Sequence, residues 1–195
     1  MENEQFLFRT IRQEEAEQAA DIERICFPPH EACSKEHMLA RIAKASELFL
    51  VAVDKKTGKI AGFLNGIATD EQVFRDEFFT DEGLHVPNGS NIMILGLDVL
   101  PQYRHQGLAR EIVQRYLCME KEKGRKQAIL TCLPDKIEMY QKMGFSDRGL
   151  ANSAWGGEQW HEMCYTLNES LGKCRYQAMD EIYTGGNGDD AAKTL

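Results

Sequence analysis

The feature that most constrains this chain is a strand that turns directly into a helix. Asn91–Val99 (NIMILGLDV) is nearly all apolar and predicts a buried strand. A polar turn (PQYRHQG) follows, and from Leu108 apolar residues recur with the period of a helix that buries one face. The first N–H groups of such a helix lack partners, and its dipole adds positive charge there. The turn at Gly107 therefore predicts an anion site suited to phosphate.

Alternating and buried apolar runs predict the other elements. Further strands are expected at residues 6–12, 48–53, 60–67, 128–133, from 145 onwards, and at 159–167. Helices are expected at 14–26, at 35–45 behind an N-cap at Ser34, from 108 to the stop at Gly124, and as a short helix that bears Tyr140. An Asp135–Glu138 pair is a candidate cap for this short helix.

One long connection, residues 69–90, is polar and irregular but contains three phenylalanines. A connection of this length in a compact domain is usually a binding loop or a disordered one. Two interpretations stay open: the phenylalanines form a packed lid with a short helix, or they only anchor the loop to the core.

The length of 195 residues suits one domain with a single core, and no repeat or second domain is apparent. We expect a domain over 1–167 and a C-terminal extension over 168–195. The extension has a candidate short helix at 171–182 and a Gly- and Asp-rich stretch that predicts mobility.

Composition excludes several classes of protein. The net charge of −8 argues against a nucleic-acid surface and favours a cationic small molecule as partner. No apolar run approaches the ~20 residues of a membrane helix, and the acidic start MENEQ is unlike a signal peptide. We therefore expect a cytoplasmic chain that binds no membrane. The six cysteines are expected to be reduced thiols, and their spacing predicts no metal site.

Three motifs in succession resemble a known family. The turn carries Arg-x-x-Gly-x-Ala (Arg104, Gly107, Ala109), a strand follows at 128–133, and then comes Tyr-x-x-x-Gly-Phe from Tyr140 to Phe145. This succession resembles the GCN5-related N-acetyltransferase (GNAT) superfamily over most of the chain. The resemblance implies an α/β (α+β) fold with a mixed central sheet of about seven strands flanked by helices. The segments ERICF, LTCLPD and MYQKMGF and the ending WHEM look most like the arylalkylamine N-acetyltransferase branch.

The resemblance also implies acetyl-CoA as co-substrate and a set of residues that hold it. Backbone N–H groups around the turn would bind the pyrophosphate, and Gly107 would let the backbone come close. An arginine of the turn would add a phosphate contact. A distorted fourth strand would align the thioester. Two interpretations of Gly96 stay open: it permits this distortion, or it only relieves crowding. The predicted cofactor residues are Leu97, Asp98, Val99, Arg104, His105, Gln106, Gly107, Leu108, Ala109 and Arg110.

Tyr140 occupies the position of the family's general acid, which protonates the departing thiolate. A coenzyme A thiol has a pKa of about 8.5 if it resembles cysteine, against about 10 for tyrosine, so an ordinary phenol donates uphill by ~2 kcal/mol. The alternative is a tyrosine that only packs against the cofactor.

A base is also needed, because an alkylamine with a pKa of about 10.4 is mostly protonated at pH 7. Vertebrate members of the arylalkylamine branch carry two histidines on the fourth strand. This chain has Met93 and Leu95 at those positions, so that base system is absent. Insect relatives use a glutamate in a Phe-Phe-x-x-Glu-like segment, which FPPHE resembles. Glu31 is therefore the first candidate, with His30 as the alternative.

The resulting prediction is an acetyl-CoA-dependent N-acetyltransferase that acts on a small primary amine by direct transfer. An arylalkylamine would suit aromatic residues that are candidates to line the acceptor site, namely Phe27, Phe74, Phe78 and Trp155. The alternatives are a protein or peptide N-acetyltransferase and a non-catalytic acyl-CoA-binding module. A second copy of the chain is a further candidate partner, as a homodimer.

Overall fold

The computed structural model describes residues 3–167, which form seven strands and four α-helices in the order expected from the sequence. The candidate helix at 171–182 and the Gly- and Asp-rich stretch lie outside the described residues. The strands are β1 (Phe6–Thr10), β2 (Phe49–Asp54), β3 (Ile60–Thr69), β4 (Asn91–Val99), β5 (Gln127–Cys132), β6 (Ser146–Leu150) and β7 (His161–Thr166). The helices are α1 (Ala16–Cys26), α2 (Lys35–Ala45), α3 (Leu108–Glu122) and α4 (Ile137–Lys142).

A single mixed sheet holds all seven strands in the order β1-β2-β3-β4-β5-β7-β6. Only β4 and β5 run parallel, and the other neighbours are antiparallel. The parallel pair needs a crossover, which α3 provides between β4 and β5. This architecture confirms the predicted fold class.

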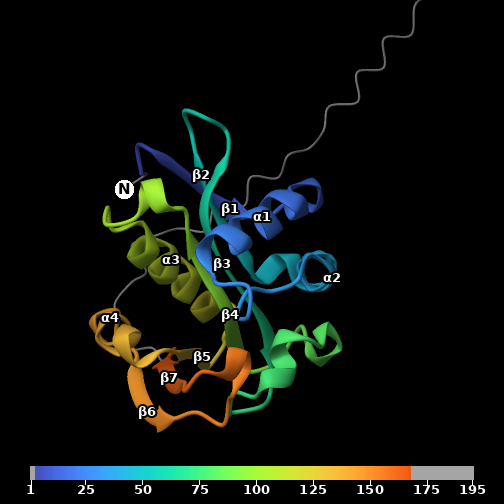
Figure 1. Ribbon diagram of the computed structural model, residues 1–195, viewed down its shortest axis with the longest axis vertical. Helices are drawn as coiled ribbons and strands as arrows, with labels where there is room; N and C mark the ends of the chain where they lie inside the picture. Colours follow the sequence, from blue (N-terminus) through green and yellow to red (C-terminus); the bar gives the residue numbers. More distant parts are fainter. Residues whose placement is uncertain (1–2, 168–195) are drawn as a thin grey trace, which may run out of the picture.

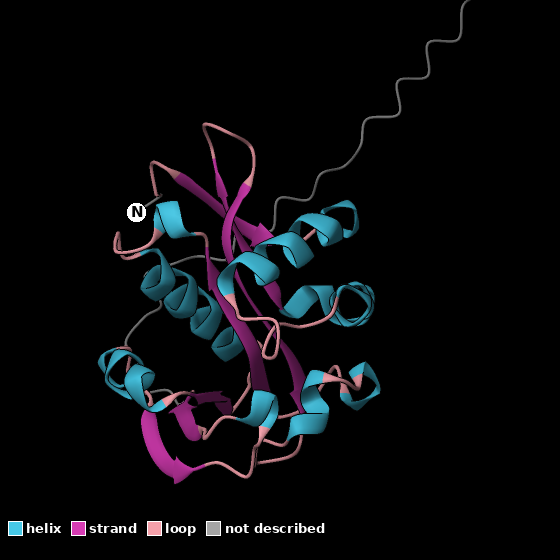
Figure 2. Cartoon of the chain, viewed as in Figure 1, coloured by secondary structure: helices cyan, strands magenta, loops and turns pink. Residues whose placement is uncertain are grey.

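Helices cover both faces of the sheet (Figures 1 and 2). On one face, α1 and α2 bury apolar residues such as Ile22, Met38 and Ile42 against β2 and β3. On the other face, α3 packs Ile112 and Tyr116 against the same central strands. The apolar stripes that predict these helices are the surfaces by which they pack.

The two parallel strands separate after a short paired stretch. β4 pairs with β5 only through Asn91–Met93 and Gln127–Ile129. Beyond Met93, β4 continues toward the N-terminus of α3 without β5 beside it. The register with β3 also shifts here, so that Leu95 is an extra residue between Ile94 and Gly96. The fourth strand is therefore distorted at Leu95, the residue before Gly96.

The connection between β3 and β4 is packed and contains two 3-10 helices, Asp76–Phe79 and Glu82–Leu84. Phe74 and Phe78 are 0% and 1% exposed and pack edge to face, whereas Phe79 is only partly covered. Two phenylalanines therefore anchor the segment to the core, and Phe79 packs partly against them.

Local signals at the helix ends succeed at one place and fail at another. The Ser34 hydroxyl accepts a hydrogen bond from the His37 N–H at 3.2 Å, which confirms the predicted N-cap of α2. The prediction that Asp135 and Glu138 cap the short helix is wrong. α4 begins at Ile137 behind a 3-10 turn that contains Asp135, and no side chain caps it.

Within residues 3–167, no helix is long and apolar enough to cross a membrane. The cysteines of this part of the chain form no disulfide.

Phe78→Ala should lower the free energy of unfolding by about 3–5 kcal/mol, because it removes a buried ring that holds the 70–90 connection to the core. Val73→Ala, a change in the same segment at a residue that is 58% exposed, should stay within about 0.5 kcal/mol. Urea denaturation measures both. Equal, small effects would show that the ring does not anchor the segment.

Candidate active site

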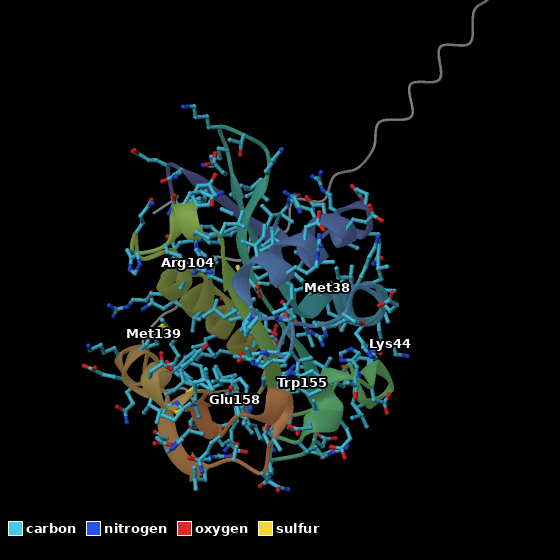
Figure 3. All side chains as sticks on the ribbon, in the orientation of Figure 1. Met38, Lys44, Arg104, Met139, Trp155 and Glu158 are labelled. Atoms are coloured by element: carbon cyan, nitrogen blue, oxygen red, sulfur yellow. The ribbon has the colours of Figure 1, made fainter. Side chains whose placement is uncertain are left out.

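The separation of β4 from β5 opens a cavity of about 620 Å³. Its walls come from α1 and the loop after it, the exposed edge of β4, the turn before α3, the end of β5, and α4. In Figure 3, Arg104 lies on the side of the turn before α3 and Trp155 lies on the side of the last two strands. Both residues line the cavity, so it reaches across the molecule from one region to the other.

The predicted anion site lies at one end of this cavity. Gly107 is the N-cap of α3, has a φ of +83°, and no side chain caps the helix. A Cβ on Gly107 would meet no atom within 4 Å, so the space over the turn is open. Free N–H groups, a helix dipole and an open approach together suit a phosphate.

Most of the predicted cofactor residues line the cavity, namely Leu97, Val99, Arg104, His105, Gly107, Leu108, Ala109 and Arg110. Arg104 also fixes the turn to the strand, because its Nε donates to the Val99 carbonyl oxygen at 2.8 Å. Gln106 does not line the cavity, and its amide instead donates to the Gln102 carbonyl oxygen at 3.0 Å.

Asp98 is the other predicted cofactor residue that does not line the cavity, and its carboxyl group is completely buried. The alternation of the strand turns its side chain toward α1, on the face opposite to the neighbouring Leu97 and Val99. Burial, and then the charge of the nearby Glu23, raise the pKa of Asp98 well above its usual value. Its side chain thus belongs to a buried acidic group and not to the cofactor surface.

Tyr140, from α4, lines the same cavity and is 9% exposed. Its ring packs edge to face on Phe145 at 5.6 Å between centroids, which fixes its position. Burial is the main cause that raises the pKa of Tyr140, followed by the charges of Cys132 and Asp98. The phenol is thus protonated at neutral pH, but it donates further uphill than the ordinary tyrosine assumed from the sequence.

Glu31 lies in the loop after α1 and also lines the cavity. Its Oε1 is 3.4 Å from His30 Nε2, and its backbone carbonyl oxygen accepts from the Trp155 indole at 2.9 Å. Side chains of His, Cys, Asp and Glu can bind metal ions. Within residues 3–167, His30, Glu31 and Glu158 form the one group of three such side chains whose potential ligand atoms lie within 4.8 Å of one another.

The aromatic lining differs from the sequence prediction. Phe27 and Trp155 line the cavity as expected, but Phe74 and Phe78 are buried in the core and do not. Phe79 takes their place and stacks on Trp155 at 4.8 Å between ring centroids. Because Phe74 and Phe78 pack inward, the backbone of the 3-10 helix turns Phe79 toward the cavity.

A buried polar group, which sequence reasoning missed, lies against the bulge of β4. It contains Glu23 from α1, Arg41 from α2, Asn65 from β3 and Asp98 from β4. Arg41 donates to Asn65 Oδ1 at 2.8 Å and to the Phe79 carbonyl oxygen at 3.0 Å. Glu23 and Arg41 line the cavity. The available signal was a glutamate on the apolar stripe of α1, one turn after Ala19 and Ala20.

Comparison with protein-family models places the chain in a family. Residues 16–145 match the model of the acetyltransferase (GNAT) family. Because this match covers more than half of the chain, the protein belongs to the GNAT family and is an acyltransferase that uses acyl-CoA. A comparison with curated proteins gave no match.

Solved structures agree with this fold. The loading GNATL domain of CurA from Lyngbya majuscula has a TM-score of 0.71 and 14% identity, covering 83% of this chain and 98% of that one. The ribosomal-protein-S18-alanine N-acetyltransferase from Escherichia coli has a TM-score of 0.62 and 14% identity, covering 88% of this chain and 99% of that one. A phosphinothricin acetyltransferase from Sinorhizobium meliloti in complex with acetyl-CoA has a TM-score of 0.61 and 14% identity, covering 86% of this chain and 91% of that one. At this identity the likeness shows the fold alone.

Gly107→Ala should raise the dissociation constant for coenzyme A at least about tenfold, because a Cβ enters the space that the phosphate needs and strains the turn. Gly58→Ala is a matched control. Gly58 also has a positive φ (+69°) and open space at its Cβ, but lies in the β2–β3 turn. Calorimetry with coenzyme A measures both. Equal affinity of the two variants would exclude the anion site at Gly107.

Proposed function

We propose that this protein transfers the acetyl group of acetyl-CoA to a small primary amine, an arylalkylamine being one option. The observation that carries the proposal is that one cavity joins the open anion site at Gly107, the unpaired edge of β4 and the phenol of Tyr140. These are the groups that phosphate binding, carbonyl polarisation and thiolate protonation require.

The residues fit acetyl-CoA. The N–H groups at the start of α3 would hold the pyrophosphate, and Arg104 and Arg110 border the same space. Acetyl-CoA supplies a thioester, whose carbonyl needs hydrogen-bond donors as negative charge develops on its oxygen. Leu97 and Val99 line the cavity where β4 has no partner strand on that side.

Tyr140 is our candidate for the acid that protonates the thiolate. Burial keeps its phenol protonated, and the packing on Phe145 holds it in place. As a thiolate forms inside the cavity, the same loss of solvation that raises the pKa of Tyr140 also raises that of the thiol. The two values therefore rise together, which limits the uphill cost of the transfer.

The acceptor end of the cavity supports an amine with an apolar body. Phe27, Phe79, Leu95 and Trp155 line it. The net charge of −8 favours the approach of a cation over long range. Glu31 stays a candidate for the base, since its carboxylate lies on the same cavity.

The experiment that tests this function is thiol release from acetyl-CoA with phenethylamine, tryptamine, spermidine, an aminoglycoside and short peptides. Release that depends on one of the small amines is the expected result. Release with peptides alone would instead support a peptide acetyltransferase. Binding of acetyl-CoA without release by any acceptor would overturn the proposal in favour of a non-catalytic module.

Tyr140→Phe should lower kcat by about 10²-fold or more and leave the affinity for acetyl-CoA unchanged, because only proton donation is lost. Tyr116→Phe is the control. Tyr116 is also buried, but its hydroxyl donates to the Leu48 carbonyl oxygen at 3.2 Å and does not line the cavity. It should lose about 1 kcal/mol of stability and keep its turnover. A Tyr140→Phe variant with full kcat would remove Tyr140 as the acid.

A further inference from the structure

We infer that Glu23, backed by Asp98, is the group that receives the ammonium head of the acceptor and takes its proton. This inference rests on the proposed function and deepens it, since it assigns the acceptor as a primary ammonium held by a buried carboxyl pair. Neither residue is part of the predicted base, and sequence reasoning placed Asp98 on the cofactor side.

The position of Glu23 fits this role. Its side chain is 4% exposed, yet it lines the cavity. A Cβ on Gly96 would lie 3.3 Å from Asp98 Oδ2 and 3.6 Å from Glu23 Oε2. The carboxyl pair therefore sits directly on the bulge of β4, next to the Leu97–Val99 edge that borders the cofactor space.

The carboxyl oxygens that lie beside Gly96 accept no hydrogen bond from the described residues. Cys33 N–H donates to Glu23 Oε1 at 3.0 Å, but Glu23 Oε2 and both oxygens of Asp98 lack partners among the described residues. Buried polar atoms are nearly always paired, so unpaired ones at a cavity indicate a missing ligand or proton. One proton shared by the two carboxyls, and the N–H groups of an ammonium, would satisfy them.

The charges around the pair leave room for such a ligand. Three further side chains surround the pair of Glu23 and Asp98. They are Arg41 from α2, Cys26 from α1 and Cys33 from the loop after α1. Burial raises the pKa of both thiols to about 11, so they are neutral. Arg41 is a cation whose charge acts on both carboxyls, and Arg104 is a cation beside Cys26. Arg41 already donates to Asn65 and Phe79, and its remaining Nε has no partner.

With Asp98 protonated, Glu23 is a carboxylate of raised basicity. Burial is the main cause that raises its pKa, and the N–H of Cys33 and the charge of Arg41 partly oppose this. A base with a pKa nearer to neutral accepts a proton from an ammonium more readily than an ordinary glutamate does.

Glu31 differs in two respects that favour Glu23. Its carboxylate already has a neighbour, His30 Nε2 at 3.4 Å, and it belongs to a loop beside the exposed Glu158. Glu23 is instead held on a helix against the strand that would align the thioester. A general base must lie within hydrogen-bond reach of the reacting nitrogen, and the bulge of β4 is where that nitrogen has to arrive.

Proton transfers accompany the formation of the amide. The ammonium gives one proton to Glu23 Oε2, and the neutral nitrogen forms a bond to the acetyl carbon. The C–S bond breaks, the sulfur takes one proton from Tyr140, and the nitrogen gives up its second proton, which restores the phenol. The products are an amide, a thiol and one proton on Glu23, which passes to solvent.

The test compares Glu23→Gln with Glu31→Gln and with the control Glu17→Gln, an exposed glutamate on the same helix. With the amine that the wild-type protein acetylates, Glu23→Gln should lower kcat/KM by about 10²–10⁴-fold. Its affinity for acetyl-CoA should equal that of the wild-type protein, and its melting temperature should show that it is folded. The wild-type rate should rise with pH as the carboxyl pair ionises, and this rise should be absent in Glu23→Gln.

A binding experiment separates recognition from chemistry. In the presence of coenzyme A, phenethylamine should compete with the acceptor in the wild-type protein more strongly than 2-phenylethanol, which lacks the charge. Glu23→Gln should abolish this preference for the cation, whereas Glu17→Gln should keep it. A merely structural role for Glu23 would change stability but leave the preference intact.

Two results would overturn the inference. If Glu23→Gln acetylates the amine as fast as wild type, or if only Glu31→Gln loses activity and the pH dependence, Glu23 is not the acceptor group. In both cases the wild-type protein is still an amine acetyltransferase, so the proposed function stands. If wild type acetylates no amine at all, the proposed function fails, and the inference falls with it.

Discussion

The loss of hydrogen bonds between β4 and β5 is the constraint on which the site depends. A parallel pair that continued to the ends of both strands would fill the cavity with backbone. Because pairing stops at Met93, the rest of β4 presents one edge without a partner strand, and the chain covers that edge from both sides with helices. Unpaired backbone groups are costly when they are buried and dry, so this edge is stable only beside solvent or a ligand.

The bulge at Leu95 has a second effect on the same strand. An extra residue changes which side chains face each helix layer, so Leu97 and Val99 border the cavity while the side chain of Asp98 turns toward α1 and α2. Glu23 thus lies in the cavity wall, and the fully buried Asp98 lies behind it. Gly96 has no side chain, and its Cβ would meet Asn65 Nδ2 at 2.9 Å, so the polar group and the glycine depend on each other.

Much of the fold could be predicted from the sequence, because the apolar periodicity of α3 and the continuous apolar run of β4 are local signals. The turn at Gly107 could be recognised for the same reason. Glu23 and Phe79 could not, since their roles follow from packing between segments far apart in the chain. On its own helix Glu23 reads as one charged residue among several, and only the position of β4 makes it a buried partner of Asp98. Asp98 was assigned to the cofactor because the family resemblance covers Leu97–Val99 as one stretch, whereas alternation along the strand sends its side chain to the opposite face.

The two ends of the cavity are continuous, from Arg110 beside α3 to Trp155 beside the last strands. A molecule that joins a coenzyme A moiety to an amine through one covalent link would therefore reach both ends at once. Its second contact would form at a high effective concentration, since the first has already lost most of the entropy of association. Such a conjugate should bind far more tightly than either half, which makes the shape of the cavity a starting point for selective ligands.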